Sequence, residues 1–224
     1  MIAATTAANL KFAVYLGVAL LVGLVLHEYG HAWMADRLGD QTPRRFGRLT
    51  LNPRPLVDPL GTIILPVFLL LLAAAGGAAV PFAYAKPMPL NPMALRRPNS
   101  DMVRITLAGP AANLIVAAAA GIGLRLLGSP NPSSDVFQFL FAFLLANLFM
   151  GVFQLMPIPG LDGAKLLARY LHGRAKEVYE SMDQYLPLFM LLVFFIILAP
   201  VVGFVNIFTR ALCKAFAGSA CPFV

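Results

Sequence analysis

The sequence predicts an all-α polytopic membrane protein, a helical bundle of about four to six membrane segments with one re-entrant or extended segment. Of the 224 residues, 59% are hydrophobic and only 12% are charged, whereas about a quarter of the residues of a soluble domain are charged. The apolar residues gather in blocks, several of which reach the ~20 residues that a helix needs to cross the hydrocarbon core. The basic residues lie in the connections between these blocks, as is typical of the cytoplasmic loops of membrane proteins.

Five blocks are almost free of charge and are the candidate membrane segments. In chain order they are Met1 to Leu26, Leu60 to Ala83, Val103 to Leu127, Val136 to Leu155 and Leu186 to Phe208. The first block contains Lys11 and has no basic segment before it, so we expect a retained span rather than a cleaved signal peptide. No repeat and no separate soluble region is visible, which indicates one membrane-embedded domain over residues 1–224.

The net charge of +7 has two possible explanations, a nucleic-acid surface or the cytoplasmic loops of a membrane protein. We expect the second, and no nucleic-acid partner, because the connections differ sharply in Lys and Arg content. Residues 36–58, 86–104 and 162–183 each contain four or five Lys and Arg residues taken together, and residues 128–135 contain none. The basic connections are therefore predicted to lie on the cytoplasmic side, and the connection without basic residues outside.

The block Leu60 to Ala83 lies between two basic connections, so a single crossing would place one of them outside. It is also interrupted by four helix-breaking residues: Pro66, Gly76, Gly77 and Pro81. We expect a re-entrant element that enters from the cytoplasmic side, turns at the two glycines and returns as an extended segment, Ala85 to Pro92. Non-helical backbone at membrane depth persists only where it is buried in protein or lines a wet cavity, so such a cavity is predicted. A full crossing that violates the charge rule is the alternative.

The first block leads into an H-E-x-x-H sequence that starts at His27 and ends at His31. On a helix, residues four apart share a face, so both imidazoles can reach one ion. Glu28 then lies beside the metal, where it can take a proton from a bound water. The alternative is a pair of interfacial histidines next to a neutral, hydrogen-bonded acid. Since ionisable groups in a membrane span are costly and usually functional, the pattern favours a metal site.

A catalytic zinc ion needs a third protein ligand and one open position. His172 is the remaining histidine, but it lies in a basic connection and is more typical of a solvated loop residue. Asp162 is the better candidate, because it follows the fourth long apolar block and a break formed by Pro157 and Pro159, which should end that helix. An N-cap of a helix over Gly163 to Leu171 is the alternative role for this aspartate, yet two histidines in need of a carboxylate favour ligation.

These features together resemble the site-2 protease family of intramembrane zinc metalloproteases. The central likeness is the H-E-x-x-H sequence at a span end, paired with Leu161-Asp162-Gly163 after a Pro-x-Pro break. Four other stretches resemble bacterial members: Leu49 to Pro53, Asp58 to Thr62, Ala85 to Pro92 with its A-K-P-x-P sequence, and the A-G-P-x-x-N helix start Ala108 to Asn113. Two positions depart from the family pattern, because Gln154 stands where Asn is usual and Gly160 replaces a commoner Pro.

The resemblance implies one Zn²⁺ per chain, held by His27, His31 and Asp162, with Glu28 as the general base that activates water for attack on a peptide bond. The extended segment is expected to offer an edge on which an unwound substrate can pair. Its candidate contacts are Lys86, Pro87, Met88 and Pro89. Three polar side chains are candidate contacts to the substrate backbone or the oxyanion, or else interhelical hydrogen bonds: Asn113, Asn147 and Gln154. Trp33 is expected to be an interfacial anchor.

The resemblance further implies a multi-pass enzyme of the cell membrane whose active site lies near the cytoplasmic side. It would cut within or near the transmembrane segment of a membrane-tethered regulatory protein. The expected partner in the bilayer is a single-span substrate, such as an anti-sigma factor or a membrane-tethered transcription regulator.

Several hypotheses compete with an intramembrane protease. A metal-dependent transporter predicts polar residues along a path through several spans, whereas the spans here are nearly free of charge outside the motif. A non-catalytic adaptor would lack Glu28 or a ligand. Only the family resemblance disfavours a non-proteolytic zinc hydrolase. The two cysteines, Cys213 and Cys221, are either free thiols or a disulfide.

Overall fold

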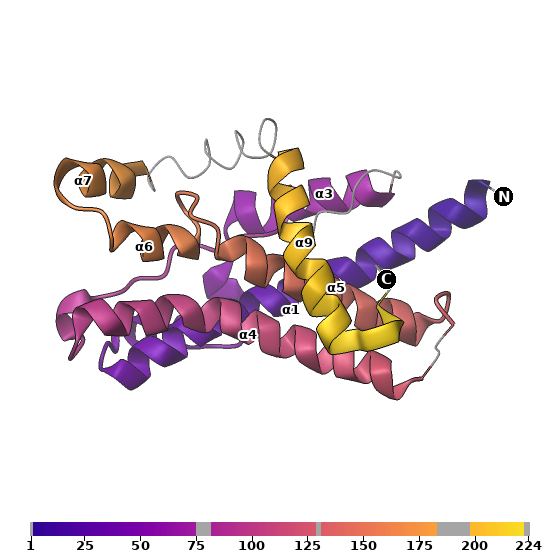
Figure 1. Ribbon diagram of the computed structural model, residues 1–224, viewed down its shortest axis with the longest axis horizontal. Coiled ribbons are helices and arrows are strands. Elements are labelled where there is room, and N and C mark those ends of the chain that lie inside the picture. Colours follow the sequence, from indigo (N-terminus) through magenta and orange to yellow (C-terminus); the bar gives the residue numbers. More distant parts are fainter. Residues whose placement is uncertain (1, 75–81, 129–130, 183–197, 222–224) are drawn as a thin grey trace.

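The computed structural model describes residues 2–74, 82–128, 131–182 and 198–221 (Figure 1). Within these ranges the chain forms helices and connecting segments and no strand, which confirms the all-α prediction. The long helices are α1 (Ile2–Leu38), α4 (Pro98–Leu126), α5 (Asp135–Gln154) and α9 (Leu198–Ala217). The short α-helices are α2 (Thr42–Arg45), α3 (Leu65–Ala74), α6 (Asp162–Ala168) and α7 (Gly173–Ser181). A π-helix, Pro59–Ile64, leads into α3, and 3-10 turns lie at Arg54–Leu56, Pro92–Ala94 and Gly218–Ala220.

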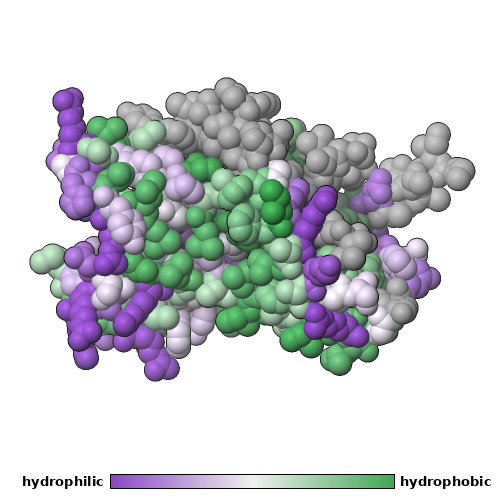
Figure 2. All heavy atoms as spheres, in the orientation of Figure 1, coloured by the Kyte–Doolittle hydropathy of each residue, from purple (hydrophilic) through white to green (hydrophobic). Residues whose placement is uncertain are grey.

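Three of the described helices are long and apolar enough to cross a membrane: Asn9–Leu38 of α1, α4 and α5. Their outward faces carry exposed aliphatic side chains, as expected of a surface in contact with lipid. On α1, for example, these are Leu10, Val14, Val18, Leu21 and Val22. Figure 2 shows the result, a broad hydrophobic middle zone with hydrophilic side chains concentrated toward the two ends of the long axis. The chain is therefore a membrane protein.

Helices α1, α4 and α5 pack on one another, and α9 lies across α4 and α5 (Figure 1). Small residues bring α1 and α4 close together. A Cβ atom added to Gly30 would lie 2.7 Å from the carbonyl oxygen of Ala108, well inside normal contact distance. Close backbone approach through small residues is the usual way in which membrane helices pack. It brings the motif face of α1 directly against the first half of α4.

The region between α1 and α4 shows the return of the chain that the charge pattern predicts. The Tyr84 N–H donates to the Gly61 carbonyl (3.1 Å), and the Thr62 hydroxyl donates to the Tyr84 carbonyl (2.8 Å). The chain therefore enters along the π-helix and α3 and comes back to the level at which it entered. The apolar helix Pro59–Leu71 is also shorter than a full span. The expected turn at Gly76 and Gly77 lies outside the described residues.

The returning segment, residues 82–91, is extended and is attached at several points. The Lys86 N–H donates to the Leu56 carbonyl (3.0 Å), and the Asn91 N–H donates to a carboxylate oxygen of Asp40 (2.7 Å). Asp40 is fully buried just beyond α1 and also accepts from the Thr42 N–H (2.9 Å). These bonds fix the segment against the end of α1, and so beside the H-E-x-x-H sequence.

One helix boundary agrees with the sequence prediction and one differs from it. The first helix continues through the motif to Leu38, as the resemblance of His27 to Gly39 to a family motif helix implies, and Gly39 with φ of 112° terminates it, a role that favours glycine. The interpretation of Ala108 to Asn113 as a helix start is wrong, since α4 begins at Pro98 and Pro110 lies inside it. Proline at the first helical position fits because its missing N–H is unused there, and the Asp101 carboxylate accepts from the Arg97 N–H (2.9 Å).

The other two apolar blocks agree in part with the helices seen. Helix α5 covers Asp135–Gln154 and ends before Pro157, as the two prolines predict. The expected span Leu186 to Phe208 falls partly outside the described residues. Its described part belongs to α9, which continues to Ala217.

The end of the bundle opposite the motif is held together differently. Lys11 of α1 pairs with Asp135 at the start of α5. The Arg125 guanidinium, near the end of α4, donates to the Ala215 carbonyl of α9. Cys213 and Cys221 form a disulfide with a Cα–Cα distance of 5.8 Å. Both cysteines are buried in an apolar cluster with Leu124 and Phe137, next to the connection that contains no basic residue.

Candidate metal centre

The H-E-x-x-H sequence lies inside α1, where its histidines project on one face. Both imidazoles are buried, with 2% of His27 and 5% of His31 exposed. Their Nε2 atoms are 3.0 Å apart, and the two rings meet edge to face. Two nitrogen donors of different residues this close are arranged to share one ion.

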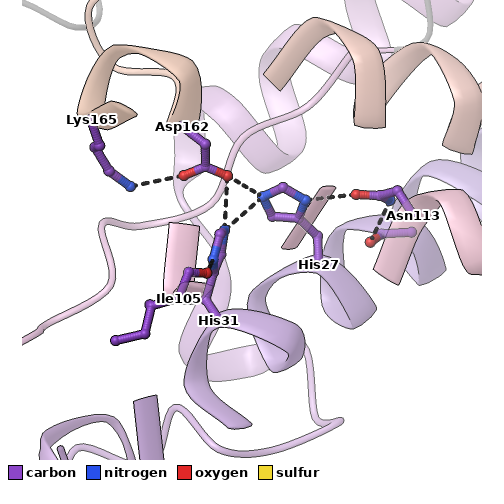
Figure 3. Close-up of polar contacts among 7 residues, drawn as sticks. His27, His31, Ile105, Asn113, Asp162 and Lys165 are labelled. Carbon is purple, nitrogen blue, oxygen red and sulfur yellow. Dashed lines mark hydrogen bonds and ion pairs between the residues drawn. The ribbon is translucent and has the colours of Figure 1, made fainter. Parts of the chain in front are cut away.

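Asp162 of α6 completes the group, with its carboxylate pointing toward both imidazoles (Figure 3). Its Oδ2 atom lies 3.1 Å from His27 Nε2 and 2.9 Å from His31 Nε2, and the residue is 4% exposed. The three donor atoms thus form a nearly equilateral triangle. A tetrahedral zinc site with bonds of ~2.0–2.1 Å has ligand–ligand distances of about 3.3 Å. Since nitrogen and carboxylate oxygen are ordinary zinc ligands, both the chemistry and the size of the group fit this ion.

Asp162 does not act as an N-cap, which was the alternative role for it. It is the first residue of α6, the cap position belongs to Leu161, and no side chain caps the helix. The tight approach of α6 to the end of α5 depends on the next residue. A Cβ atom added to Gly163 would lie 2.2 Å from the Leu155 carbonyl oxygen. Glycine at that position therefore lets the short helix carry its carboxylate to the histidines.

Hydrogen bonds on the far side of each imidazole fix its tautomer. The His27 Nδ1–H donates to Asn113 Oδ1 (2.6 Å), and the His31 Nδ1–H donates to the Ile105 carbonyl (2.7 Å). Both oxygens only accept hydrogen bonds here, so each ring carries a proton on Nδ1 and turns its Nε2 atom toward Asp162. Partners of this kind orient metal-binding histidines and raise their basicity.

The amide of Asn113 is itself oriented by two bonds. Its Nδ2 group donates to the Gly23 carbonyl (3.1 Å) and to Asn147 Oδ1 (2.9 Å), which leaves Oδ1 for His27. Asn147 in turn donates to the Phe143 carbonyl (2.9 Å). The chain of bonds therefore joins α1, α4 and α5 behind the first histidine.

Helix α4 presents bare backbone where it faces the two histidines. A Cβ atom added to Gly109 would lie 2.3 Å from His31 Nε2 and 2.8 Å from His27 Cε1. Any larger residue at this position would occupy the space of the ligands. The motif on α1 thus requires a matching glycine on α4.

The second carboxylate oxygen of Asp162 is also engaged, because Lys165 Nζ lies 3.0 Å from Oδ1. Burial of Asp162 opposes its ionisation, but His31 and Lys165 outweigh that effect and hold the pKa of the carboxyl well below its usual value. The carboxylate is therefore charged and presents one oxygen to the histidines.

A cavity of about 290 Å³ opens beside the group. Glu28 lines it together with the ligands, and its buried Oε2 atom has no hydrogen-bond partner among the described residues. A buried carboxylate oxygen without a partner is costly unless a water or another group satisfies it. The position next to the histidines is where a metal-held water would meet this oxygen. The cavity is also lined by Tyr84, whose phenol has a pKa raised by burial.

The candidate substrate contacts divide into two groups. Lys86, Pro87, Met88 and Gln154 line the cavity, whereas Pro89 is not among its lining residues. Asn113 and Asn147 are fully buried and have their amides engaged between helices, which is the alternative that the sequence left open. Their contact with a substrate stays a prediction.

The remaining candidates behave as ordinary surface residues. His172 is exposed, away from the metal group. Trp33 is 41% exposed and has the Arg37 guanidinium 5.2 Å from its ring centroid, as suits an interfacial anchor.

Three contributors to the site were not identified from the sequence: the Ile105 carbonyl, Gly109 and Lys165. The glycine lies in the A-G-P-x-x-N stretch, whose pattern suggests a helix start. The sequence therefore marks this residue but does not indicate that it packs against the histidines. Lys165, three residues after Asp162, matches the spacing at which helical side chains meet.

Comparisons with known proteins agree with this geometry. The sequence model of peptidase family M50 matches residues 15–132, which contain both histidines. "Putative zinc metalloprotease YwhC" of Bacillus subtilis is 34% identical over 161 residues, which are 68% of this chain and 67% of that protein. "Putative zinc metalloprotease Rip2" of Mycolicibacterium smegmatis is 35% identical over 182 residues, 76% of this chain and 65% of that protein.

The protein of the same name from Mycobacterium tuberculosis is 35% identical over 175 residues, 78% of this chain and 64% of its own. The chain thus spans about two thirds of the length of these relatives. No solved structure matches it.

Proposed function

Because the chain belongs to peptidase family M50, the site-2 protease family, we propose that it is an intramembrane zinc endopeptidase. Its substrate is the transmembrane segment, or its edge, of a membrane-tethered regulatory protein. One observation carries the proposal: His27, His31 and Asp162 meet beside Glu28 in a cavity within a bundle of membrane-spanning helices. A single-span anti-sigma factor or transcription regulator is the kind of partner proposed.

The three ligands and the glutamate divide the chemistry between them. A zinc ion bound by the ligands supplies a Lewis acid and lowers the pKa of a bound water toward ~7. His27 and His31 offer Nε2 lone pairs, since their protons are held on Nδ1 by Asn113 and Ile105. Glu28 accepts the water proton on its free Oε2 and returns it to the leaving amine.

The extended segment positions the substrate. The N–H groups of Tyr84, Lys86 and Asn91 are bonded within the protein, and Pro87 and Pro89 have none. Met88 and Leu90 retain N–H groups that donate to no acceptor among the described residues. Residues two apart in an extended chain present their N–H groups to the same side, so both can bond to an unwound substrate by strand addition.

The orientation in the membrane is proposed from the two ends of the bundle. Basic side chains cluster around the metal end, where Arg44, Arg45, Arg48, Arg96, Arg97 and Arg104 lie, which favours the cytoplasmic side of the cell membrane. The disulfide Cys213–Cys221 lies at the opposite end, and disulfides persist in oxidising compartments outside the cytoplasm. Both features support a cytoplasmic active site.

The test compares wild type with Glu28→Gln and Asp162→Ala, each purified and reconstituted in liposomes with a single-span model substrate. We expect full zinc content without cleavage for Glu28→Gln, because the ligands remain and the base is lost. Reduced zinc is expected for Asp162→Ala. Unimpaired cleavage by Glu28→Gln would falsify the mechanism. Zinc flux by the wild type without cleavage would instead support a metal transporter, and hydrolysis of a lipid ester alone would support a non-proteolytic hydrolase.

A further inference from the structure

A second cavity, larger than the one beside the metal group, lies among the start of α4, α6 and α7. Its volume is about 470 Å³. One wall is formed by the first turns of α4, with Met102 and Val103, and the other by α6 and α7, with Leu166 and Tyr179. We call this cavity the α6–α7 groove. The helices that surround it lie together at the end of the molecule away from both termini (Figure 1).

Hydrogen bonds hold the walls of the α6–α7 groove in place. The Arg169 guanidinium donates to the Asn99 carbonyl of α4 (2.8 Å). The Tyr179 hydroxyl donates to the Pro157 carbonyl in the loop before α6 (2.8 Å). The groove is therefore a formed feature of the fold.

Among the residues that the structure describes, the charged side chains that line the α6–α7 groove are all basic. They are Lys165, Arg169 and Lys176. Between these cations lie apolar side chains, which suit the uncharged side chains of a bound chain. Low-dielectric walls of one charge focus the potential on an oppositely charged ligand. The chemistry indicated is an acidic ligand with apolar side chains between its charges.

The α6–α7 groove is continuous with the cavity of the metal group. Met102, Thr106 and Lys165 line both. A chain whose peptide bond lies at the metal ligands could therefore pass into the groove without leaving the protein. A lipid headgroup offers charge, but it contains no peptide bond at the metal ligands from which a chain could continue into the groove.

We propose that the α6–α7 groove binds an acidic extended peptide, the cytoplasmic part of the substrate that continues from the scissile bond. This inference rests on the proposed function and adds a specificity determinant to it. Segments rich in Asp and Glu next to the cut site are the favoured substrates. Lys176 on α7 and Arg169 after α6 contact their carboxylates.

The experiment measures binding alone, with Glu28→Gln protein in zinc-loaded form and in nanodiscs of neutral phosphatidylcholine. The probe is a fluorescent peptide of about ten residues, roughly 33 Å when extended, that contains several glutamates. A matched peptide carries lysines at the same positions. Anisotropy is recorded at low salt and at about 0.15 M, where charges are screened beyond ~8 Å.

We expect the glutamate peptide to bind more tightly than the lysine peptide, with an affinity that falls as salt rises. Lys176→Glu should lower the affinity for the glutamate peptide by about five-fold, as expected for reversal of one partly exposed charge. The control Arg174→Glu changes an exposed charge on the same helix that does not line the groove, and it should alter the affinity by less than about two-fold. Lys176→Glu should also gain affinity for the lysine peptide, a change that simple misfolding cannot produce.

Equal binding of the two peptides, or equal losses for Lys176→Glu and Arg174→Glu, would overturn the inference. The inference would also be overturned if nanodiscs of phosphatidylglycerol abolished peptide binding through Lys176. The lipid headgroup would then be the occupant of the α6–α7 groove. The assay contains no cleavage step. Loss of peptide binding therefore leaves the zinc and cleavage tests of the proposed function unaffected, and failure of those tests leaves the binding result standing.

Discussion

The two halves of the candidate metal centre are held in different ways. His27 and His31 lie inside the long helix α1, and each is bonded behind its ring to α4. Asp162 comes from the other half, a loop and the seven-residue helix α6, and its second oxygen is held by Lys165, whose side chain is 43% exposed. The side chains of the histidine half are thus fixed by buried contacts between helices, whereas the Asp162 carboxylate, apart from its contacts with the histidines, is held by one partly solvated ion pair.

This difference indicates which half sets the geometry and which half can adjust. Buried hydrogen bonds between packed helices are costly to break, whereas a partly exposed ion pair contributes little. Substitutions behind the histidines should therefore damage zinc binding more than substitutions behind the aspartate. The following experiments use zinc affinity, measured by competition with a chromogenic chelator, to test that order.

The largest effect is expected from Gly109→Ala. The new Cβ atom would lie 2.3 Å from His31 Nε2 and 2.8 Å from His27 Cε1, so both imidazoles must move. Zinc affinity should fall by more than about a hundred-fold, since two ligands are displaced together. The control Gly123→Ala, on the same helix, meets only the tip of Leu140 at 3.3 Å and should retain zinc. Unchanged zinc affinity in Gly109→Ala would show that the histidines are not fixed by α4.

Asp162→Asn should have the second-largest effect, and zinc affinity should fall by about a hundred-fold at most. The shape of the side chain is kept, but the charge that attracts the cation is lost. Asp135→Asn, at the opposite end of the bundle next to Lys11, is the matched control and should leave zinc binding as in the wild type. A variant Asp162→Asn that binds zinc normally would contradict the ligand assignment.

Asn113→Ala tests the support behind the first histidine. It removes the acceptor for His27 Nδ1–H and the side-chain donor to the Gly23 carbonyl. Loss of such a partner typically costs about ten- to a hundred-fold in metal affinity, and we expect roughly ten- to thirty-fold. Asn147→Ala acts one bond further away, so its effect should be smaller. If the two variants lose zinc equally, the network acts through helix packing rather than through His27.

The smallest effect is expected from Lys165→Met. Loss of the ion pair frees Asp162 to rotate, while removal of a nearby positive charge favours the cation, so the two effects oppose each other. Zinc affinity should change by less than about five-fold, and Lys165→Arg should lie closer to the wild type. A loss as large as that of Asn113→Ala would mean that the two halves are equally rigid, and the comparison would fail.

The histidine half is also the more predictable from sequence. Residues four apart on a helix share a face whatever surrounds them, so the spacing of His27 and His31 is enough to pair them. Asp162 needs a further argument, because a loop residue is placed by tertiary contacts. The role of Gly109 cannot be assigned from sequence, since it depends on how closely α4 approaches α1.

The helix boundaries show the same limit. Apolar blocks mark membrane depth, but α1 continues through polar residues to Gly39, whose φ of 112° ends it. Glycine at that position is a helix stop signal, so this helix end is readable from the sequence although the apolar block ends earlier. By contrast, Pro98 begins α4, whereas the apolar block begins at Val103 and the family motif indicates a start at Ala108 to Asn113. Proline indicates a helix start only when it occupies the first helical position. The neighbouring residues decide which of several prolines occupies that position.

The unbroken length of α1 determines how deep in the membrane the proposed peptide-bond cleavage occurs. From Lys11, which pairs with Asp135 at the opposite end of the bundle, His27 lies roughly 24 Å along the helix at 1.5 Å per residue. The hydrocarbon core is about 30 Å thick. The proposed cleavage would therefore fall at a constant level, close to one face of the bilayer, for substrates of unrelated sequence. In a thicker membrane the fixed length of α1 would shift the cleavage site along the substrate. Mass spectrometry of the products from bilayers of different thickness would measure that shift directly.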